Sequence, residues 1–297
     1  LARPLAGIAV VPVHILAVRV VDRVGKGIRS SPRDALIAAS VPATEAGRAF
    51  GLQRALDHAG AVIGPLVAAV LIKAGFEMRE VFLLAAIPAG LAVLSLAFVR
   101  EDAREPAPAR KPSAAVPLSP RLRRYLAIVF LFSLGNSTDA FLLLRARSIG
   151  VSEAALPLLW AVLHVSKVLS AYVGGGAADR MARPRLIALG WVVYGLAYIG
   201  LGFASTEWHA FALFAFYGTY YGLTEPAEKA LVGELAPEGG RGRAFGAYNF
   251  LVGVSAIPAG LLTGIIWQRV SPLAALSVGA AIAAVAMVLL LDWERRA

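Results

Sequence analysis

The stretch VRVVDRVGKGIRSSPRDALIAASVP, from Val18 to Pro42, places a charged helix inside an otherwise apolar chain. At about 100° per residue, its charged side chains fall on one helical face and its apolar side chains on the other. The charged residues are Arg19, Asp22, Arg23, Lys26, Arg29, Arg33 and Asp34. An isolated segment of this kind would be a solvated surface helix, and the apolar runs on both sides decide against that interpretation.

The composition indicates a helical protein that crosses a membrane many times. The 297 residues are 58% hydrophobic and 16% charged, and the mean hydropathy is +0.69. A soluble domain averages about 45–50% apolar and about 25% charged residues. Long apolar runs recur, so we expect an all-α polytopic membrane protein in a lipid bilayer. The basic residues behind the net charge of +10 cluster in short loops, which is typical of membrane topology and argues against nucleic acid as a partner.

The apolar runs predict nine full spans and one partial span. A full crossing takes about 20 residues, so Leu1–Val11 is expected to be only the end of a helix. The full spans are expected at Val13–Val41, Arg48–Lys73, Glu80–Phe98, Arg124–Ser148, Ser152–Ala178, Arg185–Ser205, Trp208–Ala236, Arg243–Trp267 and Ser271–Asp292.

Residues 100–123 are rich in proline, alanine and charge, which predicts a linker between two helical bundles, residues 1–99 and 124–297. Arginines and lysines concentrate in this linker, in every second loop after it and near the C-terminus. Since cytoplasmic loops carry the excess of basic residues, we expect the linker and the C-terminus in the cytoplasm.

An internal repeat predicts how the bundles are related. The motif GRAFG occurs at Gly47–Gly51 and again at Gly242–Gly246, an offset of 195 residues, and Pro42 matches Pro237 in the same register. Parallel repeats of this kind are a known plan of transporters. The second half has three spans whose counterparts would lie before residue 1, so we expect the first bundle to be incomplete.

Two motifs resemble those of the major facilitator superfamily. The first, G-x-x-x-D-R-x-x-R-x-R, resembles the superfamily's cytoplasmic loop motif and consists of Gly175, Asp179, Arg180, Arg183 and Arg185. The second resembles its fifth-helix motif, common in drug–proton antiporters, and consists of Gly60, Gly64 and Pro65. An aspartate at a helix end can accept hydrogen bonds from a neighbouring helix N-terminus, and small residues let helices approach closely.

The fragments DRVGKGIRSSPRDAL, LGNSTDAFLLLRA and GLTEPAEKAL resemble a group of bacterial permeases of the same superfamily. The resemblance implies a major facilitator fold of two pseudo-symmetric six-helix bundles in the bacterial inner membrane. It also implies a monomeric secondary transporter that moves a small-molecule substrate by alternating access, with proton-coupled efflux as the expected mode. Two alternatives remain open: uptake or exchange of an anionic solute, and a non-transporting membrane receptor or scaffold.

Ionisable groups inside a bilayer cost at least about 2.5–3.5 kcal/mol each at a helix centre, so they normally face a cavity or a partner. The residues expected to line the substrate cavity are Arg19, Asp22, Arg23, Lys26, Arg29, Arg54, Asn136, Lys167, Tyr248 and Asn249. The residues expected to carry protons are Asp139, Glu225 and Glu228, followed by Asp57 and His58. The alternative for any one of them is a salt bridge between bundles that holds one conformation shut.

The sequence has no constellation typical of an enzyme. Cysteine is absent, and the four histidines stand on separate predicted spans or near their ends, so we expect no metal site, no cofactor and no catalytic residues. No G-x-x-x-x-G-K-[ST] occurs, so we expect an ion gradient, and not nucleotide hydrolysis, to supply the energy.

Overall fold

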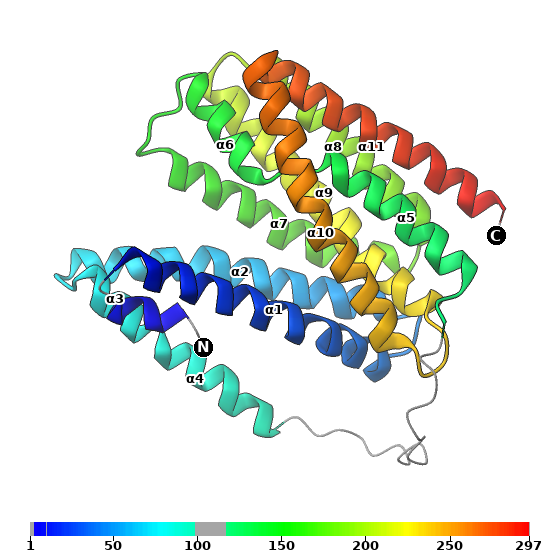
Figure 1. Cartoon of the computed structure of the whole chain (residues 1–297), viewed down its shortest axis with the longest axis horizontal. Helices are drawn as coiled ribbons and strands as arrows, with labels where there is room; N and C mark the ends of the chain where they lie inside the picture. Colours follow the sequence, from blue (N-terminus) through cyan, green and yellow to red (C-terminus); the bar gives the residue numbers. More distant parts are fainter. Residues whose placement is uncertain (1–2, 10, 99–116, 297) are drawn as a thin grey trace. The chain divides into compact units, whose positions relative to one another are not determined.

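The computed structural model describes residues 3–9, 11–98 and 117–296, and these residues form helices without any β-strand (Figure 1). The all-α prediction is therefore confirmed for the described part of the chain. In chain order the elements are η1 (Arg3–Ile8), α1 (Pro12–Ser40), α2 (Ala46–Lys73), α3 (Met78–Leu84), α4 (Ala86–Leu94), η2 (Ser95–Phe98), α5 (Pro120–Gly135), α6 (Asp139–Ser148), α7 (Leu156–Ala178), α8 (Arg183–Phe203), α9 (Glu207–Leu235), α10 (Arg241–Arg269) and α11 (Pro272–Arg295).

Six helical segments in the described residues are long and apolar enough to cross a membrane. They are Ala46–Lys73, Pro120–Ser148, Leu156–Ala178, Arg183–Phe203, Arg241–Arg269 and Pro272–Arg295. Helices α1 and α9 are 29 residues each, which is also sufficient length, but they are not among these six. The expected count of nine full spans therefore stays a prediction.

Proline and capping residues interrupt two of the expected spans. Glu80–Phe98 is divided into α3, α4 and η2, because Pro88 has no amide hydrogen to donate to the carbonyl of Leu84, where α3 ends. Arg124–Ser148 is divided between α5 and α6, where the Thr138 side chain accepts the first hydrogen bond of α6. The second break places polar residues in the middle of a span.

The N-terminal segment also differs from the expectation. Leu1–Val11 was expected to be the end of an α-helix, and its described part forms the 3-10 helix η1. Runs of 3-10 helix are usually short and have poorer hydrogen-bond geometry than an α-helix.

The chain divides into two compact units. The first contains the described residues of Leu1–Ser30 and Ile63–Val116, and η1 packs against α3 within it. The second contains Ser31–Val62 and Pro117–Ala297, so the end of α1 and the start of α2 belong to the same unit as α5 to α11. This division follows different boundaries from the expected bundles, which remain a prediction.

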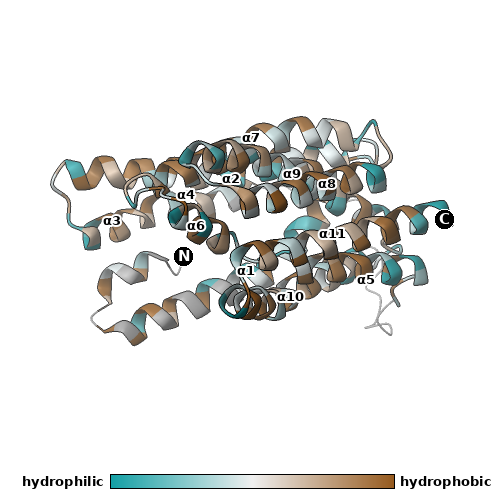
Figure 2. Ribbon diagram, turned by 90° about the horizontal axis from the view of Figure 1, so that it is seen from above, coloured by the Kyte–Doolittle hydropathy of each residue, from teal (hydrophilic) through white to brown (hydrophobic). Residues whose placement is uncertain are grey.

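The second unit has an aromatic core and an apolar outer surface. Helix α7 packs along α9, and α8 packs against α9 and α11. Trp191, Tyr194, Tyr198 and Tyr217 fill the centre and are fully buried. Apolar side chains such as Ile257 of α10 and Val288 of α11 are exposed, and Figure 2 shows hydrophilic residues at the C-terminal end of α11. Such an apolar exterior is what a lipid environment requires of a membrane helix.

Residues 195 positions apart in the sequence contact one another within the second unit. The three pairs are Asp34 with Lys229, Ala38 with Gly233, and Phe50 with Phe245. The ion pair measures 2.8 Å, the phenyl centroids are 5.9 Å apart, and a Cβ on the glycine would lie 3.3 Å from that of the alanine. Equivalent residues related by a two-fold axis can touch each other only beside that axis. The three pairs are therefore the contacts expected beside a pseudo-two-fold axis between the repeats.

Candidate functional site

Asp179 of the predicted loop motif caps the start of α2. Its carboxylate accepts hydrogen bonds from the backbone N–H groups of Gly47, at 2.7 Å, and Arg48, at 2.9 Å. Helix α2 begins at Ala46, so these donors have no partner within their own helix, and the helix dipole favours a negative charge there. This is the hydrogen bonding that the sequence predicts for an aspartate at a helix end.

Glycines of the first GRAFG copy make this contact possible. A Cβ on Gly175 of α7 would lie 2.7 Å from the carbonyl oxygen of Gly47 and 2.9 Å from the Cα of Gly51. Real Cβ atoms do not approach backbone atoms so closely, so larger residues would push α2 and α7 apart. The repeat motif therefore has a packing role in the first half.

The arginines of the loop motif have different surroundings. Arg183 pairs with Glu234 of α9 at 2.5 Å and also donates to the carbonyl oxygen of Ala43, which lies between α1 and α2. Arg185 pairs with Glu294 of α11 at 3.2 Å, and Arg180 is exposed. Through these arginines the loop contacts both the connection between α1 and α2 and the helices α9 and α11.

The expected fifth-helix motif lies in the middle of α2. Pro65 is accommodated inside the helix, and a Cβ on Gly60 or Gly64 would meet no atom of the described chain within 4 Å. The close helix approach expected at these glycines therefore stays a prediction.

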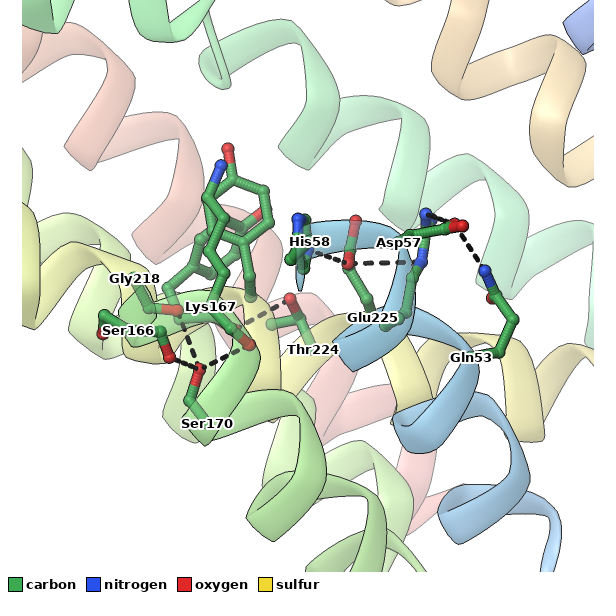
Figure 3. A network of polar contacts seen from close by, with 12 residues as sticks. Gln53, Asp57, His58, Ser166, Lys167, Ser170, Gly218, Thr224 and Glu225 are labelled. Atoms are coloured by element: carbon green, nitrogen blue, oxygen red, sulfur yellow. Dashed lines mark hydrogen bonds and ion pairs between the residues drawn. The ribbon is translucent and has the colours of Figure 1, made fainter. Parts of the chain in front are cut away.

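Predicted charged groups on α2 converge on Glu225 of α9 (Figure 3). Arg54 Nε lies 3.2 Å from the Glu225 carboxylate, and His58 Nε2 lies 3.4 Å from it. Asp57 lies 3.6 Å from the guanidinium groups of both Arg54 and Arg33. The i, i+3 and i, i+4 spacing therefore produces one cluster, in which an acid of the second half faces a guanidinium and an imidazole of the first.

A second cluster surrounds Asp139, the first residue of α6. Its carboxylate accepts hydrogen bonds from Lys167 Nζ, at 3.0 Å, and from the hydroxyls of Tyr217 and Tyr221, at 2.9 Å each. The buried Lys167 ammonium also lies 3.6 Å from the ring centroid of Tyr221, a cation–π contact. Asn136, in the break before α6, donates to the hydroxyl of Tyr220 at 3.1 Å.

Two histidines bring these clusters together. The rings of His58 and His164 pack edge to face, with centroids 5.7 Å apart, and His164 lies on α7 one turn before Lys167. We call the resulting line of titratable groups the polar row: Asp57, Arg54, Glu225, His58, His164, Lys167 and Asp139. No group of three or more histidine, aspartate or glutamate side chains in the described residues is placed to hold a metal ion.

Glu228 differs from the two other main proton-carrier candidates. It is 6% exposed, and its carboxylate accepts a hydrogen bond from Tyr248 at 2.6 Å. Asp139 and Glu225 each face a cation, whereas no ion pair to Glu228 occurs among the described residues. The neighbouring Asn249 donates to the hydroxyl of Ser31 at 3.3 Å.

Most of the charged face of α1 belongs to the first unit. Asp22 is half-buried, Lys26 and Arg29 are exposed, and the side chains of Arg19 and Arg23 lie outside the described residues. Their expected place in a substrate cavity therefore stays a prediction.

Asp34 and Lys229 form the most deeply buried ion pair among the described residues of the unit, and neither was expected to line the cavity or to carry protons. Asp34 is 0% exposed and Lys229 is 1% exposed. The repeat contained the signal, because the offset of 195 aligns these two residues and gives them opposite charges. The tyrosines around Asp139 carried no comparable signal, since an aromatic residue at helical spacing usually belongs to a core.

Comparisons with known proteins show the family of the chain. A sequence model of the Major Facilitator Superfamily matches residues 2–163 and 126–297. An MFS-type transporter of Methanocaldococcus jannaschii is 31% identical, over 91% of this chain and 69% of that protein. A protein of Mycobacterium tuberculosis is 27% identical, over 88% and 66%. The class C tetracycline resistance protein of Escherichia coli is 26% identical, over 81% and 63%.

A solved structure shows the same fold. The E. coli fucose:proton symporter superposes with a TM-score of 0.65 and 11% identity, over 89% of this chain and 73% of that one. Long apolar helices with buried ionisable groups between them are typical of an integral membrane protein. The chain belongs to the Major Facilitator Superfamily. It spans about two-thirds of the length of the relatives it matches, from 63% to 69%.

Proposed function

We propose that this chain is a secondary active transporter that works by alternating access and exports a small solute in exchange for protons. The observation that carries the proposal is the Asp34–Lys229 ion pair on the pseudo-two-fold axis. A buried ion pair adds little net stability over apolar packing of the same volume. A pair between equivalent residues of two repeats is better explained as a contact that breaks and re-forms during a transport cycle.

Other contacts support closure of the same end of the second unit. The Phe50–Phe245 contact lies beside the axis, and Asp179 caps the start of α2. We infer that these contacts close the cytoplasmic face, in line with the basic loops of that side. The protein would be a monomer in the bacterial inner membrane, with its linker and C-terminus in the cytoplasm.

Among the candidate carboxyl groups, we assign proton binding first to Glu228. An ionised carboxylate that is buried without a cation is costly, so a change of its protonation state is coupled strongly to a change of its surroundings. Asp139 and Glu225 are held by Lys167 and Arg54, which favours a role in binding or in gating. The relative named as a tetracycline resistance protein supports efflux as the direction.

The alternative is uptake or exchange of an anionic solute. The charge of helix α1 favours it. Residues 19–29 of this helix contain one acid, Asp22, and four basic residues, which are Arg19, Arg23, Lys26 and Arg29. A positive excess in a low-dielectric cavity is stabilised when an anion or water enters.

A solute screen in vesicles tests the proposal. The full-length chain would be reconstituted and assayed with and without a pH gradient, beside a Glu228→Gln variant. Export driven by the gradient in the wild type, with exchange alone in the variant, supports proton coupling. Transport of anions that is indifferent to the gradient would favour the alternative, and the absence of any transport would favour a receptor or scaffold.

A further inference from the structure

A pocket of about 640 Å³ lies between the start of α5 and the end of α11. Its lining changes from charged to apolar along both helices. The charged end consists of Arg121, Arg124, Asp292 and Arg296, and the apolar end consists of Ala127, Ile128 and Leu289. None of these residues belongs to the polar row or to the loop motif.

Trp293 shapes the pocket wall and positions Arg121. Its indole Nε1–H donates to the carbonyl oxygen of Arg121 at 3.2 Å, which fastens α11 to the first turn of α5. The Arg121 guanidinium lies 5.1 Å from the indole centroid, and the ring of Tyr125 packs against the indole at 5.6 Å between centroids. The guanidinium is therefore held beside the pocket while its N–H donors remain available for a ligand.

The pocket has an excess of positive charge. Asp292 pairs with Arg296 at 2.9 Å, so these two charges offset each other. Across the described ranges, no carboxylate forms an ion pair with Arg121 or Arg124. The two arginines are three positions apart on α5 and share one helical face, so both can reach the same ligand.

We propose that this pocket binds an anionic phospholipid. The phosphodiester lies against Arg121 and Arg124, because guanidinium groups match the planar, bidentate geometry of phosphate oxygens. An acyl chain follows the apolar end, along Ala127, Ile128 and Leu289. Trp293 stands where an amphipathic ring suits the membrane–water interface. A free phosphate ion would use the arginines but would gain nothing from the apolar end, and basic pockets at helix ends are suited to lipid headgroups.

Native mass spectrometry of the full-length protein, stripped of lipid, tests this site. The probes are phosphatidylglycerol and phosphatidylcholine with the same acyl chains. We expect preferential binding of phosphatidylglycerol to the wild type. Arg121→Gln and Arg124→Gln should each weaken that binding about fivefold, and the double variant about thirtyfold.

Arg123→Gln is the matched control, because it removes the same charge from the same helix turn but Arg123 does not line the pocket. We expect less than a twofold change for this variant. Equal losses in all three single variants would overturn the proposal, since they would show diffuse attraction in place of a pocket. Displacement of the lipid by an equal concentration of glycerol phosphate would also overturn it, because the site would then recognise a soluble anion.

Discussion

The buried ion pair on the pseudo-two-fold axis can be tested by removing one charge and then exchanging both. Lys229→Met keeps a long side chain but removes the ammonium partner of Asp34, which retains its ion pair with Arg33, at 3.3 Å. Breaking a buried pair costs about 3–5 kcal/mol when the remaining charge has no partner, and the nearby Arg33 makes this the upper range for Asp34. Only the conformation in which α1 and α9 touch bears this cost, so the ratio of separated to closed molecules should rise by up to roughly 150- to 5,000-fold.

The chain contains no cysteine, so a single introduced thiol can report the change. Ala38→Cys places it one turn from Asp34, where the native side chain is buried. We expect a membrane-impermeant maleimide to label this thiol slowly in the otherwise native protein and much faster with Lys229→Met. The exchange Asp34→Lys with Lys229→Asp should restore slow labelling, because the two positions are equivalent across the axis.

A control separates this effect from a general loss of charge. Glu153→Gln breaks an exposed pair with Arg147, and exposed pairs contribute about 0–1 kcal/mol, so the labelling rate should not change. Unchanged labelling in Lys229→Met would show that the ion pair does not hold the closed conformation. An exchange variant that labels as fast as the single variant would show the same.

Three further outcomes are expected. Glu228→Gln should abolish solute accumulation driven by a pH gradient while solute exchange continues, as measured in vesicles; accumulation at the wild-type level would exclude Glu228 as the proton site. Asp179→Ala removes the cap of α2, worth about 1–2 kcal/mol, and should speed labelling of Ala38→Cys roughly 5- to 30-fold; an unchanged rate would mean that the cap does not hold the closed state. If an anionic solute is bound by the arginine-rich face of α1, Arg19→Lys and Arg23→Lys should weaken its binding although the charge is kept, because lysine lacks the bidentate fork; equal affinity in a competition assay would leave these residues a structural role.

Much of the fold could be predicted from the sequence because its signals are local or repeated. Apolar run lengths predicted the helices, and the offset of 195 residues aligned the pairs that meet at the axis. The break at Asn136–Thr138 is carried by local residues that favour caps and turns, but hydropathy averaged over a span concealed it.

The sequence predicted which residues belong to the candidate site much better than it predicted which of them contact one another. Helical spacing grouped Arg54, Asp57 and His58, and it paired His164 with Lys167. It could not predict that Glu225 faces α2, or that Lys167 faces Asp139, since such contacts depend on how separate helices pack. Asp34 was missed because a charged residue near a helix end is usually exposed to solvent. Here it is buried and paired with Lys229, which lies 195 positions away in the sequence.

We propose that contacts along the pseudo-two-fold axis open and close in each transport cycle. A disulfide between Ala38→Cys and Gly233→Cys tests this proposal most directly. A Cβ at Gly233 would lie 3.3 Å from the Cβ of Ala38, which is close to the separation of about 3.5–4.5 Å between the two Cβ atoms of a disulfide. We predict that oxidation forms the crosslink and stops vesicle transport of the solute found in the screen. Reduction should restore transport, and neither single-cysteine variant should respond. Wild-type transport by the crosslinked protein would contradict the account.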